Sequence, residues 1–260
     1  MYIETRGTGP ALVLVHGWAM HGGVFAPLVD ALARVRTLHV VDLPGHGRSA
    51  QPGARLDLDD SASELLERIG PADWLGWSLG GLVALAAAGL APERVRSLAL
   101  FATNPRFVSS PEWEHGVPHE VFAQFGAELA QDYARTIDRF IALECIGSDC
   151  ARNDMRTLQR QLYDHGIPSR EALESGLHIL DRCDMRGALS SLPMPALWLA
   201  GARDRLVPWQ AMAWAAAQMR DARFVSIAGG GHAPFIGRPE RVLAELLPFL
   251  DDETGEALAS

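Results

Sequence analysis

The residue best placed to do chemistry is Ser78, in the segment Gly-Trp-Ser-Leu-Gly at residues 76–80. The segment follows an apolar run and precedes a helical pattern. Gly-x-Ser-x-Gly in this setting is typical of a tight turn, in which both glycines make room and the serine hydroxyl is held out of the surface. The N-terminus of the following helix favours negative charge that develops beside that hydroxyl. We therefore predict that Ser78 is a nucleophile; the alternative is a glycine turn with an inert serine.

A serine hydroxyl is a weak nucleophile until a base removes its proton. His232 is the histidine best placed to be that base, since it lies in a glycine-rich segment near the C-terminus, after an apolar run. A carboxylate should orient the imidazole, and in the chain order nucleophile, acid, base it lies between the two. Asp204, just past another apolar run, fits this position, while Asp181 and Asp184 are rivals by sequence alone.

A tetrahedral oxyanion needs two hydrogen-bond donors. We expect them to be the backbone N–H groups of Leu79, directly after the nucleophile, and of Trp18, in the segment His-Gly-Trp. The indole of Trp18 is also expected to line the acyl pocket. His16, and His46 in the segment Asp-Leu-Pro-Gly-His-Gly-Arg-Ser, lie beside glycines at strand ends, so we interpret them as residues that shape turns.

These residues must be positioned by the elements around them, and short apolar runs alternate with helical patterns over most of the chain. The runs predicted as strands are 11–15, 37–41, 72–76, 95–101, 196–200 and 223–227. The helices predicted with them are 24–33, 58–69, 79–90, 209–219 and 239–250. Strands this apolar are usually covered on both faces, as in parallel sheets. The fold class is therefore α/β, with a mostly parallel central sheet flanked by helices and right-handed crossovers.

The alternation stops between residues 107 and 182. Helical patterns follow one another there, at 120–129, 132–144, 150–162 and 170–180. Because one core strand precedes this stretch and another follows it, we predict a helical cap inserted into the sheet domain. The expected division is a core of residues 1–106 and 183–251, a cap of residues 107–182, and an acidic, frayed tail of residues 252–260.

The composition argues against several classes of function. A net charge of −9 over 260 residues disfavours nucleic-acid binding, which needs a basic surface. Nucleotide-binding glycine motifs and metal-ligand spacings are absent from the sequence, so we expect no cofactor and no metal. No apolar run is long enough to span a membrane. The first residues lack a secretory pattern and the three cysteines form no CxxC pair, so we expect a cytoplasmic protein, and a monomer.

Several of these segments are similar to those of the α/β-hydrolase superfamily, namely His-Gly-Trp, Gly-Trp-Ser-Leu-Gly-Gly and Gly-His-Ala-Pro-Phe. From about Thr8 to Leu250 the chain resembles the pimeloyl-[acyl-carrier protein] methyl ester esterases of biotin synthesis. The cap segment Arg-Thr-Ile-Asp-Arg-Phe-Ile-Ala-Leu is among the more specific parts of this resemblance. It implies an α/β-hydrolase fold with a cap, a methyl ester substrate, and the acyl-carrier protein bearing that substrate as the partner.

The resemblance also implies site residues. The family's triad falls on Ser78, Asp204 and His232, in agreement with the choice made from the residues themselves. Its substrate contacts fall on Trp18, Leu79 and His232, and on the cap residues Phe140, Ile141, Ala142, Leu143 and Glu144. The family can carry a glutamine where Glu144 stands.

Four cap arginines are candidates for docking the acidic carrier protein. Arg135 and Arg139 are four residues apart on one predicted helix, and Arg152 and Arg156 are four apart on the next. Guanidinium groups suit carboxylate and phosphate partners, so with the resemblance we expect these arginines to dock the carrier. The alternative is a set of ordinary ion pairs on solvated helix faces. The interleaved acids that would form them are Asp132, Asp138, Asp149 and Asp154.

Two other functions stay open. Another cap-bearing serine hydrolase, such as a short-chain carboxylesterase acting on small esters, an enol-lactonase or a carbon–carbon bond hydrolase, would use the same three residues. A non-catalytic binding protein can also adopt this fold. Turnover of p-nitrophenyl acetate separates the binding protein from the enzymes.

Overall fold

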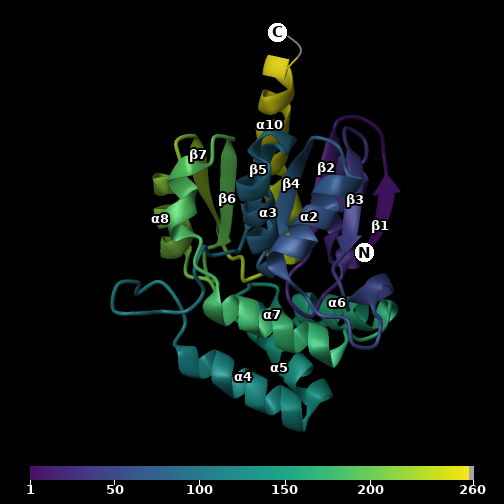
Figure 1. The fold of residues 1–260 in the computed structure, drawn as a ribbon, viewed down its shortest axis with the longest axis vertical. Coiled ribbons are helices and arrows are strands. Elements are labelled where there is room, and N and C mark those ends of the chain that lie inside the picture. Colours follow the sequence, from purple (N-terminus) through teal and green to yellow (C-terminus); the bar gives the residue numbers. More distant parts are fainter. Residues whose placement is uncertain (258–260) are drawn as a thin grey trace.

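The structure is a computed structural model that describes residues 1–257, with side chains as far as residue 251. A seven-stranded sheet in the order β1-β3-β2-β4-β5-β6-β7 forms its centre (Figure 1). Only β1 is antiparallel to its neighbour. The strands are β1 Tyr2–Arg6, β2 Ala11–Val15, β3 Thr37–Asp42, β4 Ala72–Trp77, β5 Val95–Phe101, β6 Ala196–Gly201 and β7 Ala222–Ile227.

The predicted parallel α/β sheet is confirmed, and β1 is the strand that the apolar runs did not reveal. Each of the six predicted runs coincides with a strand to within one residue at either end. Strands β4 and β6 are buried along their whole length, which requires cover on both faces. Strand β1 lies at the edge of the sheet and is largely exposed, so its polar residues give no buried-strand pattern.

Helices cover both faces of the sheet (Figure 1). In the view of the figure, α2, α3 and α8 lie in front of the strands, while α10 lies behind them and packs against α1. These helices are α1 Ala26–Leu32, α2 Leu58–Arg68, α3 Leu79–Leu90, α8 Trp209–Gln218 and α10 Pro239–Ala257, with the short α9 Pro234–Gly237 before the last. Four further turns are 3₁₀ helices, at Gly22–Phe25, Gly47–Ser49, Pro92–Arg94 and Arg186–Ser191.

Four more helices lie together at the end of the sheet where the parallel strands finish (Figure 1). They are α4 His119–Gln131, α5 Tyr133–Cys145, α6 Ala151–Asp164 and α7 Arg170–Arg182. Each coincides with one of the four helical patterns predicted between residues 107 and 182. Residues 107–118 are not helical and form a loop closed by the bridge between Val108 and Val117. The domain boundaries at 107 and 182 stay a prediction.

The turn after β3 is built by the residues to which the sequence assigned a structural role. The Asp42 carboxylate accepts hydrogen bonds from the backbone N–H of Gly22 at 2.8 Å and from the backbone and guanidinium of Arg48 at 2.9 and 2.8 Å. Nε2 of His16 accepts from the Leu43 N–H at 2.9 Å. Burial lowers the pKa of His16 to about 3 and that of His46 to about 4, so both rings stay neutral and serve the turn.

Helix α10 continues to Ala257, beyond the end predicted at residue 250. The predicted acidic tail therefore begins inside this helix, and its last part, residues 258–260, lies outside the described residues. Among the helices of residues 1–257, none combines the length and the hydropathy that a membrane span requires.

Candidate active site

Ser78 occupies a strained turn between β4 and α3. Its φ of 55° lies in the left-handed region, which a non-glycine residue adopts only when its surroundings enforce it. The flanking glycines explain how the turn is enforced. A Cβ added to Gly76 would lie 2.4 Å from the Gly80 carbonyl oxygen, and one added to Gly80 would lie 2.1 Å from the carbonyl oxygen of Val15. Strand β2 therefore packs directly against the turn and leaves room only for glycine.

The structure brings Ser78, His232 and Asp204 into one hydrogen-bonded chain. His232 Nε2 lies 3.0 Å from Ser78 Oγ, and His232 Nδ1 lies 2.8 Å from Asp204 Oδ2. The other Asp204 oxygen accepts from the backbone N–H groups of Leu206 and Val207 at 2.8 and 3.0 Å, which fixes the orientation of the carboxylate. All three side chains are buried.

Two opposing effects act on His232. Burial alone would lower the pKa of the imidazole, but the adjacent Asp204 carboxylate outweighs it, so the net pKa is raised. With Nδ1–H donated to Asp204, Nε2 is free to accept the proton of Ser78. The rival acids lie elsewhere. Asp181 pairs with His119 and Arg182, and Asp184 pairs with Arg106 and Arg186.

The main chain of His232 is held from two sides. Its N–H donates to the backbone carbonyl of Glu144 in α5 at 3.1 Å, and its carbonyl accepts from the indole N–H of Trp77 at 2.9 Å. The loop also passes close to β6, since a Cβ added to Gly201 would lie 1.9 Å from the Gly231 carbonyl oxygen. The glycine-rich sequence before His232 is thus explained by close backbone packing, and a helix of the predicted cap helps to position the imidazole.

The two predicted oxyanion donors lie on either side of Ser78. Leu79 is the first residue of α3, and Gly17, before Trp18, approaches so closely that an added Cβ would lie 3.2 Å from Ser78 Cβ. Among the hydrogen bonds found within residues 1–257, none uses the backbone N–H of Leu79 or of Trp18. Both donors are therefore available to an oxygen beside Ser78, although their role as an oxyanion hole stays a prediction.

The cavity above Ser78 is almost entirely apolar and small, with a volume of about 40 Å³. Its lining residues are Ser78, Phe107, Val117, Val121, Phe122, Phe125, Phe140, Leu177, Leu180, Leu206 and His232. Most of them belong to α4, α5 and α7 or to the loop before α4, and sequence reasoning missed all of these except Phe140. The signal was present in α4, where apolar residues at positions 121, 122 and 125 share one helix face.

Only some of the residues that were expected to contact substrate line the cavity. Phe140 lines the cavity, but the fully buried Trp18 indole packs edge-on against Phe140 at 4.7 Å and donates to the Leu173 carbonyl. The indole therefore supports the cavity wall instead of lining it. Ile141 is buried in the core, Ala142 and Leu143 are half-buried, and none of the three lines the cavity. Glu144 is buried beside the triad, also outside the lining.

The cap arginines divide into two groups. On α5, Arg139 forms an ion pair with Glu128 of α4 and lies over the Phe125 ring, as the ion-pair alternative expects. On α6, Arg152 and Arg156 are exposed and make no ion pair within the described part of the chain. Arg160, one turn further along the same face, is likewise exposed and unpaired, and sequence reasoning missed it although its spacing continues the series.

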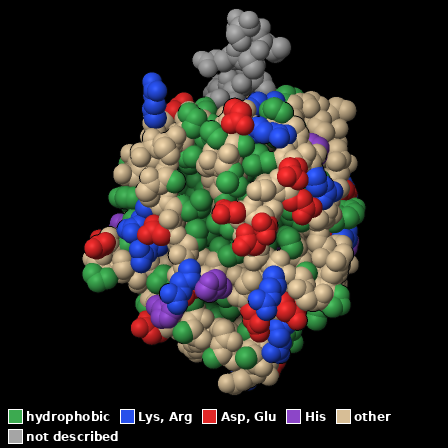
Figure 2. Space-filling view, viewed as in Figure 1, with side chains coloured by type: hydrophobic (Ala, Val, Ile, Leu, Met, Phe, Trp, Pro, Cys, Tyr) green, Lys and Arg blue, Asp and Glu red, His purple; other side chains and the backbone are tan. Residues whose placement is uncertain are grey.

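The acids that might have neutralised the arginines of α6 have other partners. Asp149 pairs with Arg203 and Arg238, and Asp154 accepts from the Ser148 hydroxyl. On the face drawn in Figure 2, basic and acidic side chains are mixed without a large patch of one sign. The unpaired arginines of α6 therefore form a local basic stripe on an acidic protein.

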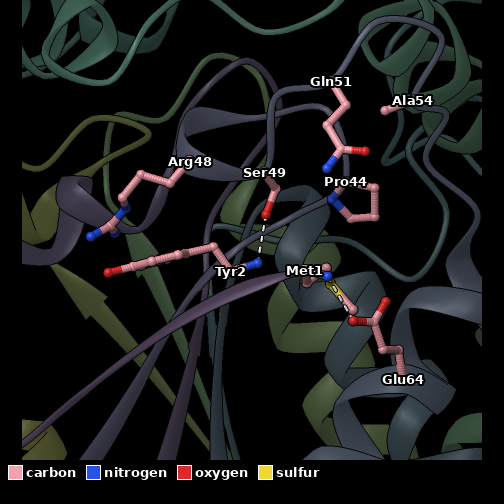
Figure 3. Close-up of a pocket in the computed structure, with 8 residues that line it drawn as sticks. All are labelled: Met1, Tyr2, Pro44, Arg48, Ser49, Gln51, Ala54 and Glu64. Carbon is pink, nitrogen blue, oxygen red and sulfur yellow. Dashed lines mark hydrogen bonds and ion pairs between the residues drawn. The ribbon is translucent and has the colours of Figure 1, made fainter.

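A second hollow, drawn in Figure 3, lies beside the N-terminal strand and away from the triad. Its walls are tied together by the Met1 ammonium on Glu64 at 2.6 Å, by the Tyr2 N–H donating to Ser49 Oγ at 2.7 Å, and by Arg48 over the Tyr2 ring. Ser49, the serine in its lining, donates its hydroxyl to the Asp42 backbone carbonyl at 2.7 Å and not to a base, so this hollow does not compete with the Ser78 site.

Comparisons with known proteins agree with this fold. A family model described as the alpha/beta hydrolase fold matches residues 10–239. A pimeloyl-[acyl-carrier protein] methyl ester esterase of Xanthomonas oryzae pv. oryzae (strain MAFF 311018) is 51% identical over 250 residues, which cover 96% of this chain and 98% of that protein. The protein of the same name from Stenotrophomonas maltophilia (strain K279a) is 50% identical, with 96% of each chain covered.

Solved structures show the same fold at lower identity. An esterase from Exiguobacterium antarcticum matches with a TM-score of 0.87 at 20% identity, covering 96% of this chain and 95% of that one. The enol-lactonase from Burkholderia xenovorans LB400 matches with a TM-score of 0.84 at 21% identity, with 96% of each covered. The chain therefore belongs to the alpha/beta hydrolase fold family, in the group that contains the pimeloyl-[acyl-carrier protein] methyl ester esterases.

Proposed function

We propose that this protein is a serine carboxylesterase that hydrolyses the methyl ester of pimeloyl-[acyl-carrier protein] to pimeloyl-[acyl-carrier protein] and methanol, a step of biotin synthesis. The observation that carries the proposal is the hydrogen-bonded chain of Ser78, His232 and Asp204 beneath an apolar cavity. The names of the relatives that are about half identical over nearly the whole chain supply the substrate.

In the proposed reaction, Ser78 Oγ attacks the carbonyl carbon of the methyl ester while His232 Nε2 takes the hydroxyl proton. The negative charge on the carbonyl oxygen is stabilised by the N–H groups of Leu79 and Trp18. His232 then gives its proton to the departing methoxide, which leaves as methanol. Water attacks the acyl-enzyme by the same route and releases the free carboxylate, so the proposed cycle consumes only the ester and water.

The cavity wall suits the acyl chain of this substrate. Apart from Ser78 and His232, each lining residue is apolar, so the methylene groups of a pimeloyl chain would exchange water for a hydrocarbon surface. We propose that residues 107–182 form the cap that supplies most of this wall. We also propose a monomer working in the cytoplasm, where the three cysteines, all free in the structure, would stay reduced.

The exposed arginines of α6 are the proposed docking site for the carrier protein. Within the described residues Arg152 and Arg156 form no ion pair, whereas Arg139 is already paired with Glu128. Arg135, exposed on the same helix as Arg139, belongs to the proposed site with less support, because Glu128 lies nearby. An acidic partner would be attracted mainly to α6, and the attraction would weaken as salt is added.

The test of the reaction is methanol release from the carrier-bound methyl ester by purified protein, compared with Ser78→Ala. We expect release by the wild type and none above background by the variant. Rescue of a biotin-requiring strain that lacks its own esterase checks the same proposal in cells. Methanol release retained by Ser78→Ala would exclude Ser78 as the nucleophile. Hydrolysis of p-nitrophenyl acetate without any rescue would leave an esterase with another substrate.

Docking is tested with the double variant Arg152→Glu/Arg156→Glu. We expect kcat/KM for the carrier-bound ester to fall by roughly tenfold or more, because both charges that attract the carrier are reversed. The rate with p-nitrophenyl acetate should not change, since this ester needs no carrier. Arg241→Glu, which reverses an exposed arginine on α10, is the matched control. Equal losses in the control and in the double variant would reject the docking site.

A further inference from the structure

Glu144 is a carboxyl group in an unusual place. It lies in the last turn of α5, only 2% of the residue is exposed, and neither carboxyl oxygen has a hydrogen-bond partner among the side chains and backbone that the structure describes. A buried polar group without a partner destabilises a fold, and natural proteins rarely keep one without a reason. The reaction described above makes no use of this side chain.

Glu144 contacts His232 through its backbone, and its carboxyl interacts electrostatically with His232 and Asp204. The backbone carbonyl of Glu144 accepts from the His232 N–H at 3.1 Å, so α5 and the histidine loop are in direct contact. The charged groups that face its carboxyl are His232, which attracts the ionised form, and Asp204, which repels it. The nearby acids after α5 are engaged elsewhere, since Asp149 pairs with Arg203 and Arg238 and Asp154 accepts from Ser148.

We propose that Glu144 is a positioning residue that acts through His232: its buried carboxyl controls how strongly the imidazole holds the proton taken from Ser78. The proposal rests on the proposed function of the triad. It assigns to the C-terminal end of α5 two effects on one histidine. The backbone of Glu144 holds the loop in place, and its side chain adjusts the charge beside the ring.

The charge beside the ring depends on pH. Burial, partly offset by His232, raises the pKa of Glu144 to about 8, so the carboxyl is neutral at neutral pH and ionises in mildly alkaline solution. An ionised carboxylate next to the imidazole favours the imidazolium that forms when His232 takes the serine proton. Proton transfer from Ser78 to His232 should therefore become easier as Glu144 loses its proton. With a glutamine at this position, the ease of that transfer would not gain this dependence on pH.

The test compares wild type with Glu144→Gln, which keeps the shape of the side chain and removes the ionisation. We measure kcat/KM for p-nitrophenyl acetate across the range from about pH 6 to about pH 10, with Ser78→Ala as the blank. The ratio of wild type to variant should rise roughly three- to tenfold between about pH 7 and about pH 9.5, because only the wild type gains the charge. Glu245→Gln, on α10 and paired with Arg223 at 3.5 Å, is the matched control, with a ratio expected to be independent of pH.

A second measurement needs no turnover. The ring proton resonances of His232 in wild-type protein should show an inflection near pH 8 that reports the ionisation of Glu144, and this inflection should be missing in Glu144→Gln. A kcat/KM ratio that stays level or falls with pH, or wild-type resonances without the alkaline inflection, would overturn the inference. If wild type hydrolyses no ester at all, the proposed function fails, and the resonances still decide the role of Glu144.

Discussion

Asp204 and Glu144 are two carboxyl groups beside the same histidine in opposite surroundings. Asp204 accepts two backbone hydrogen bonds and faces Nδ1 of His232, so its charge is compensated and its orientation is fixed. Glu144 accepts none and is neutral at neutral pH. The same functional group therefore orients the imidazole in one position and titrates near pH 8 in the other, because the hydrogen bonds differ.

The Asp204 carboxylate should determine the acid limb of the pH profile, which is the pH range in which kcat/KM falls as the solution becomes more acidic. Catalysis needs a neutral imidazole, so kcat/KM should fall as the pH falls through the raised pKa of His232, above the ordinary value of 6.5. In Asp204→Asn the largest of the effects that raise the pKa of His232 is gone. We expect this limb to move to lower pH. We also expect kcat to fall by roughly ten-thousandfold, because the asparagine no longer holds the imidazole in the tautomer that carries its proton on Nδ1. Rates with p-nitrophenyl acetate from about pH 4.5 to about pH 8 check both effects. An unmoved acid limb would contradict the assignment.

Glu144 should also make stability depend on pH. In the unfolded chain its pKa returns to the ordinary value of 4.5, whereas in the fold it is about 8, so between these values the folded state holds more protons. The contribution of Glu144 to the free energy of unfolding is therefore greatest below the unfolded pKa and decreases as the pH rises toward 8. We expect Glu144→Gln to be more stable than wild type at pH 8, with a difference that grows by up to about 1.4 kcal/mol per pH unit across this window. Urea unfolding at about pH 5 and about pH 8 measures it; equal differences at both pH values would argue against the raised pKa.

At the scale of elements, the turn that carries Ser78 depends on how closely α3 approaches β2. A Cβ at Gly80 would lie 2.1 Å from the Val15 carbonyl oxygen. Because this oxygen belongs to the backbone of β2, the contact can be relieved only if the strand itself shifts. We expect Gly80→Ala to destabilise the fold by about 3 kcal/mol and to abolish activity. Gly89, later in the same helix, has nothing within 4 Å of an added Cβ.

Gly89→Ala is therefore the control for the same substitution in the same helix. It should stabilise the protein by about 0.5–1 kcal/mol, because alanine is the better helix former. Thermal unfolding of both variants beside wild type gives the comparison. Similar losses in the two would mean that helix propensity, and not the contact with β2, decides the effect.

The sequence predicts well those elements whose burial or close packing is visible in a local pattern of residue types. Apolar runs revealed the buried strands, and Gly-x-Ser-x-Gly revealed the turn at Ser78, because glycine spacing reports close packing. The edge strand β1 was missed because one exposed strand needs no apolar pattern. The contact of Glu144 with His232, and the cavity wall on α4, depend on how distant segments meet, which no local pattern contains.

At the scale of the whole molecule, the predicted cap is joined to the loops that carry Asp204 and His232. Asp149, just before α6, pairs with Arg203, the neighbour of Asp204, and with Arg238 at the end of α9. Its backbone N–H donates to the Gly229 carbonyl at 3.0 Å. This side of the cap is therefore fixed to the triad. The opposite wall of the cavity, formed by α4, makes its contacts mainly with α5 and α7.

Entry of a substrate therefore depends on α4. A cavity of about 40 Å³ holds no more than a few water molecules, so we expect apolar cap side chains to move when an acyl chain enters. Phe122 is half-buried on α4 and lines the cavity, and its truncation makes room without opening the core. In Phe122→Ala we expect kcat/KM for p-nitrophenyl octanoate relative to acetate to rise roughly tenfold, because burying about two more methylenes at about 0.8 kcal/mol each corresponds to that factor.

The matched control for this substitution is Phe224→Ala, which removes the same side chain from β7, away from the cavity. Its ratio of octanoate to acetate should equal that of wild type. If Phe122→Ala also leaves the ratio unchanged while both esters are hydrolysed, the acyl chain does not pass along α4. The acyl chain would then have to lie against the wall formed by α7, where Leu177 and Leu180 line the same cavity.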